Sequence, residues 1–226
     1  MAFQITEYHS IKKELESYQA QLIAVSKKKP IEDIQEAIAA GQKSFGENYV
    51  QELVEKESYF KGNANWHFIG HLQSNKVKMI APFATLIQGV DSFKLLQEIN
   101  KEGKKIDKVI DCLIQVHIAQ EETKFGFSED EVEALLSFPE LVELENIRIK
   151  GLMGMASLSS DTSLLKKEFS SLKNLFNNSK LMSLEPNAFD TLSMGMSSDY
   201  KIALDCGSTM IRIGSTLFGE RNSKKK

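Results

Sequence analysis

A lysine directly follows a short apolar segment near the start of the chain. The segment reads LIAVSK and ends at Lys27. Side chains alternate between the two faces of a strand, so if Ile23 and Val25 point inward, Lys27 does too. An amine held there away from water loses its proton more readily and becomes a nucleophile that can form a Schiff base with an aldehyde. The alternative is that Lys27, Lys28 and Lys29 form a solvated basic loop.

Two segments in the last quarter of the chain are rich in small residues. They read SMGMS at 193–197 and GST at 214–216. Glycine lets a backbone approach a ligand closely, and backbone N–H groups and hydroxyls bind phosphate oxygens. Barrel proteins often bind phosphate after their seventh and eighth strands, which predicts an anion site here. Ordinary turns are the alternative for each segment taken alone.

Arg212 lies inside the apolar run MIRIG and is one of only three arginines in the chain. A guanidinium fixed on a buried strand needs a partner, because an unpaired buried charge is strongly unfavourable. One candidate partner is Asp205 or another carboxylate. The other is a ring nitrogen or a phosphate of a ligand, and the spacing does not distinguish the two.

The middle of the chain holds further polar candidates. Asn48 either points into a site or caps the helix that follows it. His67 and His71 are four residues apart on a strand and its loop, and no carboxylate completes a metal-binding pattern. We therefore expect no metal, and a buried His67 with one hydrogen bond. Four methionines near strand ends fill the core or line the site: Met153, Met155, Met194 and Met196.

Short apolar segments alternate with longer amphipathic ones along the chain, which is the pattern of strands and helices. The predicted strands cover residues 22–27, 44–47, 66–70, 86–91, 109–119, 147–156, 191–195 and 210–219. The predicted helices lie between them, and one more helix at 8–18 precedes the first strand. Their predicted caps are Gly41 after the helix that begins at Ile31, Ser92 before 93–101, Ser128 with Glu131 at 129–137, Asp161 before 164–177 and Ser198 before 199–204.

Eight strands with seven helices between them predict a closed (β/α)8 TIM barrel in the α/β class. The extra N-terminal helix at 8–18 would fill the place of the missing eighth helix. An open doubly wound sheet is the competing fold, but no GxGxxG follows the first strand. We expect one domain over residues 1–221 and a basic, flexible tail over 222–226.

The composition excludes several classes of protein. With 226 residues, 42% hydrophobic and 26% charged, the chain can bury a sizeable core, and its net charge of −3 gives no reason to expect nucleic-acid or membrane-surface binding. No apolar run is long enough to cross a bilayer, and the N-terminus does not resemble a signal peptide. Cys112 and Cys206 fit neither a disulfide framework nor a zinc site, so we expect reduced thiols in a cytoplasmic monomer.

Six segments occur in a characteristic order. They are AVSK at 24–27, FGENYVQE at 45–52, WHFIG at 66–70, GLMGM at 151–155, LSMGMS at 192–197 and GSTMIRIG at 207–214. Together they resemble the signatures of the pyridoxal-phosphate homeostasis proteins, also called proline synthetase co-transcribed homologues. The resemblance extends from about residue 22 to about residue 221. Lys28 and the lysine-rich end are minor departures from it.

This resemblance implies a barrel like the N-terminal domain of alanine racemase, carrying pyridoxal 5'-phosphate (PLP). By that analogy Lys27 holds the cofactor as an internal aldimine, and Arg212 faces the pyridine nitrogen. The residues implied to hold the phosphate are Ser193, Met194, Gly214 and Ser215. Those implied to lie near the ring or the phosphate are Asn48, His67 and Ser197.

An arginine at the pyridine nitrogen disfavours ring protonation, and an unprotonated ring is a weaker electron sink. Racemisation also needs an acid or base on each face of the substrate, and alanine racemases draw one of these from a C-terminal β-domain that we expect to be absent. We therefore expect a protein of intracellular PLP homeostasis without significant turnover, with PLP-dependent apoenzymes as candidate recipients. The alternatives are a PLP-dependent enzyme on amino acids, such as a weak racemase, and a sugar-phosphate-binding barrel in which Lys27 is only electrostatic.

Overall fold

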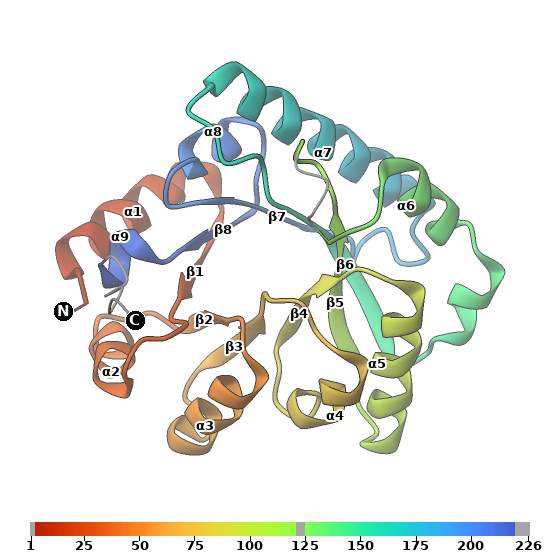
Figure 1. Cartoon of the computed structure of the whole chain (residues 1–226), viewed down its shortest axis with the longest axis horizontal. Helices are drawn as coiled ribbons and strands as arrows, with labels where there is room; N and C mark the ends of the chain where they lie inside the picture. Colours follow the sequence, from red (N-terminus) through yellow and green to blue (C-terminus); the bar gives the residue numbers. More distant parts are fainter. Residues whose placement is uncertain (1–2, 121–124, 220–226) are drawn as a thin grey trace, which may run out of the picture.

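Eight parallel strands form a closed barrel with helices around its outside (Figure 1). The computed structural model describes residues 3–120 and 125–219. Each strand pairs with the next in the chain, and β1 pairs with β8 to close the barrel. The strands are β1 (Gln21–Val25), β2 (Ser44–Glu47), β3 (Asn65–Phe68), β4 (Leu86–Val90), β5 (Ile110–Val116), β6 (Ile147–Gly154), β7 (Thr191–Met196) and β8 (Met210–Ile213). The predicted TIM barrel is confirmed, and the predicted tail at 222–226 lies outside the described residues.

The helices lie where the amphipathic segments predict them. They are α1 (Ile5–Tyr18), α2 (Ile31–Ala39), α3 (Val50–Phe60), α4 (Val77–Ile80), α5 (Phe93–Lys105), α6 (Glu129–Leu136), α7 (Thr162–Met182), α8 (Tyr200–Asp205) and α9 (Ser215–Phe218), with 3-10 turns at Ser74–Lys76 and Pro139–Glu143. Within residues 3–120 and 125–219, no helix has the length and hydropathy needed to cross a membrane.

Most of the predicted helix caps are confirmed. The side chains of Ser92 and Asp161 accept hydrogen bonds from the first turns of α5 and α7. Ser128 and Glu131 form a full capping box on α6. Gly41 follows α2 with a φ of 98°, a left-handed conformation that glycine adopts without strain.

Two boundaries near the C-terminal end of the chain were predicted wrongly. Ser198 does not cap α8, because Asp199 holds that position and its carboxylate accepts a hydrogen bond from the Met196 N–H at 2.6 Å. The eighth strand ends at Ile213 rather than at residue 219. Beyond it the carbonyl of Gly214 accepts hydrogen bonds from two following N–H groups, which turns the chain into α9.

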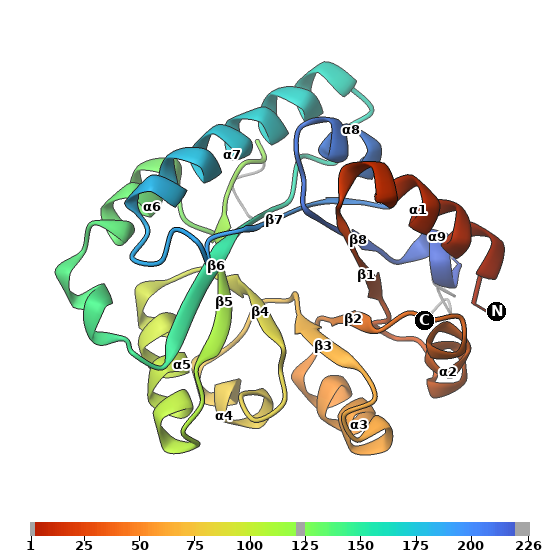
Figure 2. The same cartoon turned by 180° about the vertical axis from the view of Figure 1, so that it is seen from behind.

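Helix α1 occupies the place that an eighth barrel helix would fill, as predicted. Figures 1 and 2 show it outside the barrel beside α9. The Gln4 N–H donates to the Leu217 carbonyl at 2.8 Å, and the rings of Phe3 and Phe218 lie 5.3 Å apart. Helix α1 therefore packs against β1 and α9, beside the seam at which β1 pairs with β8.

The apolar residues form two layers. The larger layer lies between the strands and the helices, and a smaller cluster fills the inside of the barrel. The inner cluster consists of Ile23, Leu86, Leu113, Met153 and Met210. Since Ile23 points inward from β1, the phase predicted for that strand is correct.

The burial of α1 leads to a stability prediction. Ile11 is 3% exposed on this helix, whereas Ile5 is 50% exposed. Ile11→Ala should lower the free energy of unfolding by about 2 to 4 kcal/mol, because it leaves a cavity in the packed layer. Ile5→Ala is the matched control and should change it by about 0.5 kcal/mol or less. Denaturant unfolding measures both, and equal effects of the two substitutions would show that α1 does not seal the barrel.

Candidate functional site

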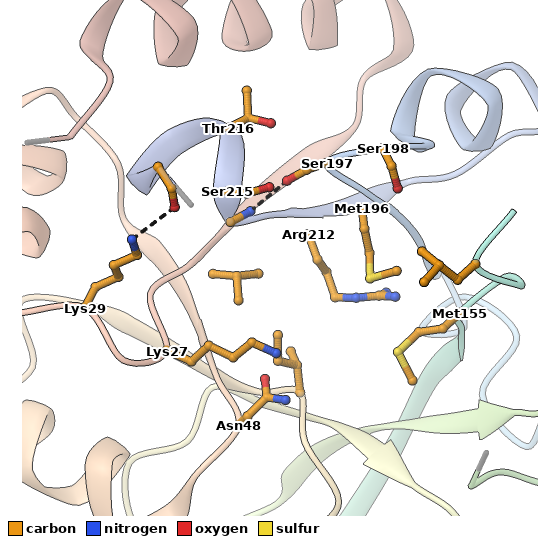
Figure 3. Close-up of a pocket in the computed structure, with 15 residues that line it drawn as sticks. Lys27, Lys29, Asn48, Met155, Met196, Ser197, Ser198, Arg212, Ser215 and Thr216 are labelled. Atoms are coloured by element: carbon orange, nitrogen blue, oxygen red, sulfur yellow. Dashed lines mark hydrogen bonds between the residues drawn. The ribbon is translucent and has the colours of Figure 1, made fainter. Parts of the chain in front are cut away.

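A cavity of about 550 Å³ opens at the C-terminal end of the barrel. Loops that follow the carboxyl ends of the strands form its walls, and in barrel enzymes this end carries the active site. Figure 3 shows the side chains that enter it. The lining residues are Val25, Lys27, Lys29, Asn48, Ile69, Met155, Leu158, Met196, Ser197, Ser198, Arg212, Gly214, Ser215, Thr216 and Gly219.

Lys27 enters this cavity from the turn that follows β1 (Figure 3). Its side chain is half-buried. The prediction that it points inward with Ile23 and Val25 is therefore confirmed. An amine at this position can reach a ligand inside the cavity while it is partly shielded from water.

The three consecutive lysines have different environments. Lys28 is exposed, and its amine lies 5.5 Å from the centre of the Tyr49 ring. The amine of Lys29 donates to the carbonyls of Phe218 and Gly219. The solvated-loop interpretation therefore applies to Lys28 and does not describe Lys27 or Lys29.

Asn48 lines the cavity and does not cap a helix. Helix α3 begins after Tyr49, which makes no side-chain cap bond. The Asn48 side-chain oxygen is buried and has no hydrogen-bond partner within the described part of the chain. A buried acceptor without a donor is unfavourable, so a ligand that brings a hydroxyl or N–H group to this point would stabilise the site.

Arg212 is fully buried inside the barrel and reaches the floor of the cavity (Figure 3). It donates to the Ser193 hydroxyl at 2.6 Å and to the Gly154 carbonyl at 2.9 Å. Both acceptors are neutral. Asp205, the carboxylate considered from the sequence, instead accepts a hydrogen bond from Tyr18. Burial lowers the pKa of Arg212 to about 10, and the negative charge of Asp199 opposes this shift. The side chain therefore stays charged at neutral pH.

A chain of hydrogen bonds leads from Arg212 across the interior of the barrel. The Ser193 hydroxyl donates to the Gln88 side-chain oxygen at 2.7 Å, and the Gln88 amide lies 3.0 Å from Nδ1 of His67. A guanidinium has only donors, so it fixes the direction of every bond in the chain. His67 therefore accepts at Nδ1 and carries its proton on Nε2.

His67 is buried with this one hydrogen bond, as the sequence predicts. Burial lowers its pKa to about 4, so the ring is neutral at physiological pH. Neither His67 nor Ser193 lines the cavity, and both are linked to Arg212 by this chain of hydrogen bonds. Gln88 was missed from the sequence, although a glutamine inside the apolar strand LIQGV was a usable signal.

The turns after β7 and β8 form one wall of the cavity. Ser197, Gly214 and Ser215 line it as predicted, together with Ser198 and Thr216. The Gly214 N–H donates to the Ser197 hydroxyl at 3.2 Å, which joins the two turns. A Cβ atom at Gly214 would lie 3.3 Å from Val25, so a larger residue would crowd the wall beside Lys27. This wall offers hydroxyls and backbone groups suited to an anion.

The side chain of Met194 is not part of this wall. It packs in the outer layer between the strands and the helices, because side chains alternate along β7 and Ser193 points into the barrel. Met155 and Met196 line the cavity, whereas Met153 fills the inner core.

Among residues 3–120 and 125–219, no group of three or more histidine, cysteine, aspartate or glutamate side chains could hold a metal ion. His71 bonds to Asp91 at 2.8 Å and stacks on Phe125. The side chains that line the cavity therefore offer two amines, a guanidinium, hydroxyls and an amide as polar groups.

The low pKa of His67 makes stability depend on pH. The folded pKa of about 4 lies below the ordinary value of 6.5, so the unfolded chain binds more protons between these two values. The free energy of unfolding should fall as the pH drops below 6.5, by at most about 1.4 kcal/mol per pH unit for this residue. His67→Gln should remove that part of the slope in denaturant unfolding between pH 7 and about 5. His9→Gln changes an exposed histidine and should keep the slope, so equal slopes in both variants would contradict the assignment.

Comparison with known proteins agrees with this geometry. Residues 6–222 match the family model described as alanine racemase, N-terminal domain. The pyridoxal phosphate homeostasis protein of Pasteurella multocida is 41% identical over 207 residues, which cover 90% of this chain and 88% of that protein.

Solved structures give the same result. PipY of Synechococcus elongatus, solved with PLP bound, superposes with a TM-score of 0.85 at 32% identity, covering 95% of this chain and 99% of PipY. Alanine racemase of Clostridium difficile shares the fold, with a TM-score of 0.74 at 16% identity, covering 97% of this chain and 57% of the racemase. The chain belongs to the pyridoxal phosphate homeostasis protein family, whose barrel is that of the alanine racemase N-terminal domain.

Proposed function

We propose that this protein binds PLP through Lys27 and acts in PLP homeostasis, holding and releasing PLP without significant catalytic turnover. The observation that carries the proposal is the half-buried Lys27 side chain inside a cavity that is also lined by the two serine- and glycine-rich turns. An amine and an anion-binding wall in one cavity match the two ends of PLP, its aldehyde and its phosphate. A PLP-bound relative of the same fold supports the choice of ligand.

The groups in the cavity fit PLP one by one. The hydroxyls of Ser197, Ser215 and Thr216 would hold the phosphate, and Gly214 would let it approach the backbone closely. The Asn48 oxygen, which has no donor within the described structure, fits the ring hydroxyl. Arg212 would face the ring nitrogen from the floor of the cavity. When bound, PLP supplies an aldehyde that an amine can attack and a ring that can accept electrons.

In this proposal Ser193 and His67 do not contact PLP and act through Arg212. Ser193 accepts from Arg212, and Gln88 links Ser193 to His67. This chain holds the guanidinium in one orientation. The phosphate-binding role expected for Ser193 and Met194 is left out, because neither side chain lines the cavity.

Two features of the cavity argue against turnover of amino acids. Arg212 stays positively charged, which disfavours a proton on any ring nitrogen that faces it. Racemisation also needs a proton-exchanging group on each face of the substrate. Among the described lining residues, Lys29 is the one amine besides Lys27, and it donates to the Phe218 and Gly219 carbonyls. The weak-racemase alternative therefore lacks a second base in this part of the structure.

The proposed role extends to partners and place of action. The attachment of an amine to an aldehyde is reversible in water, so Lys27 can release PLP as well as hold it. We propose PLP-dependent apoenzymes as recipients, and a cytoplasmic monomer as the working form. The net charge of −3 gives no attraction to nucleic acids or to anionic membranes.

The attachment site is tested by borohydride reduction. The protein is incubated with PLP, reduced and digested, and the modified peptide is identified by mass spectrometry. The adduct should lie on Lys27, and Lys27→Ala should abolish both the adduct and the yellow colour of the bound cofactor. Lys28→Ala is the matched control, because its amine is exposed outside the cavity, and it should be labelled like the native protein. A native protein that is not labelled would favour the sugar-phosphate alternative, and labelling of another lysine would refute the site.

The absence of turnover is tested with both enantiomers of a panel of amino acids. Exchange of the α-proton for deuterium and conversion between enantiomers should both be far slower than ordinary enzyme rates, which are on the order of 1 per second or more. The reason is the charge of Arg212 and the lack of a second base among the described residues that line the cavity. Racemisation at an ordinary enzyme rate would replace the carrier function with a catalytic one.

A further inference from the structure

A buried cluster of charges lies directly behind the turn that carries Lys27. Lys56 on α3 is 4% exposed, and Glu47 at the end of β2 is fully buried. The Lys56 amine lies 2.7 Å from a carboxylate oxygen of Glu47, 2.7 Å from one of Glu52, and 2.8 Å from the Ser26 carbonyl. None of the three cluster side chains has a role in the site described above.

The cluster binds the chain on both sides of Lys27. Before it, the Ser26 hydroxyl donates to Glu47 at 2.6 Å, and the Ser26 carbonyl accepts from Lys56. After it, the Lys28 N–H donates to Glu52 at 2.5 Å. The Lys29 N–H closes the turn by donating to the Ser26 carbonyl at 3.0 Å. Lys27 is thus the residue between two anchored neighbours.

The turn needs such anchoring because its backbone is strained. Lys28 has a φ of 59°, in the left-handed region that residues other than glycine and asparagine adopt at a cost in free energy. A strained conformation persists only where surrounding contacts impose it. The contacts with α3 and β2 therefore help to hold the turn that carries Lys27 in this conformation.

Global stability is a poor explanation for the cluster. A buried ion pair contributes little net stability, because removing two charges from water offsets their attraction. Glu47 also keeps one oxygen without a hydrogen-bond partner in the described structure, and burial raises the pKa of this carboxyl against the opposing effect of Lys56. Apolar side chains of similar size would pack there at less cost. The charged side chains of Glu47 and Lys56 are instead explained by the hydrogen bonds that they make to Ser26, in the turn that carries Lys27.

We propose that Glu47, Lys56 and Glu52 are positioning residues that fix the Lys27 turn, so that the Lys27 amine is directed into the cavity before PLP arrives. The inference rests on the proposed function for its consequence in PLP binding. The hydrogen bonds from Glu47, Lys56 and Glu52 to this turn, here called the clamp, are present in the ligand-free protein and are tested there as well.

The first experiment changes Glu52, which is 21% exposed and can be replaced without opening the core. Glu52→Ala removes the acceptor of the Lys28 N–H, so hydrogen exchange at that amide in the ligand-free protein should become at least about tenfold faster. The PLP dissociation constant should rise by about tenfold, and the circular dichroism band of bound PLP should weaken. Glu52→Gln keeps an oxygen acceptor and should recover a large part of each effect.

Glu98→Ala is the matched control. Glu98 pairs with Lys101 on α5 and has a similar exposure of 26%, but it lies in a different helix and makes no contact with the turn. It should leave exchange at Lys28, PLP affinity and the dichroism band unchanged.

A second variant removes the buried charges together. In Glu47→Leu with Lys56→Met no charge is left unpaired in the interior, so the fold should persist. Exchange at the Lys28 and Lys29 amides should still become at least about tenfold faster, because the anchors on Ser26 are gone. The dichroism band should weaken even when PLP saturates the protein, since it reports how the bound ring is held.

The outcomes separate this inference from the proposed function. If the native protein does not attach PLP to Lys27 but exchange accelerates in the variants, the clamp stands and the proposed function fails. If the native protein is labelled at Lys27 but the variants keep native exchange, affinity and dichroism, the clamp is refuted and the proposed function stands.

Discussion

The pairing of β1 with β8 is the constraint on which the site depends. In this register Ile23 lies opposite Arg212, and Ala24 lies opposite Ile213. The two chain segments that follow these pairs therefore emerge side by side at the same end of the barrel. One carries Lys27 and the other the turn at 214–216, so barrel closure brings together residues from opposite ends of the sequence. Helix α1 packs beside this seam from outside, which links its packing to the geometry of the site.

A second constraint is the charge of Arg212 inside the barrel. The buried guanidinium donates to two neutral acceptors, and its donors fix the direction of the hydrogen bonds through Ser193 and Gln88 to His67. Polar side chains therefore lie buried in the barrel beside its apolar inner cluster. Under the proposed function, the same charge disfavours a proton on the nitrogen of a ring that faces it.

Much of this could be predicted from the sequence, for physical reasons that differ between residues. The alternation of side chains in the strand LIAVSK predicted the position of Lys27 correctly. Ser92, Ser128 and Asp161 were predicted as helix caps because a cap depends only on residues within the first turn of its own helix. Ser198 was misplaced as a helix cap, because the position of the Asp199 carboxylate depends on tertiary contacts. The partners of Arg212, and the Glu47–Lys56–Glu52 cluster, join residues from different elements, and no spacing within one element reveals them.

We propose that one cavity holds PLP between Lys27 and the turns after β7 and β8. A crystal structure of the protein grown with PLP tests this placement. We expect continuous density from the Lys27 amine to the cofactor, with the phosphate against Ser197 and Ser215 and the ring nitrogen toward Arg212. Density on another lysine, or a phosphate bound away from these turns, would contradict it.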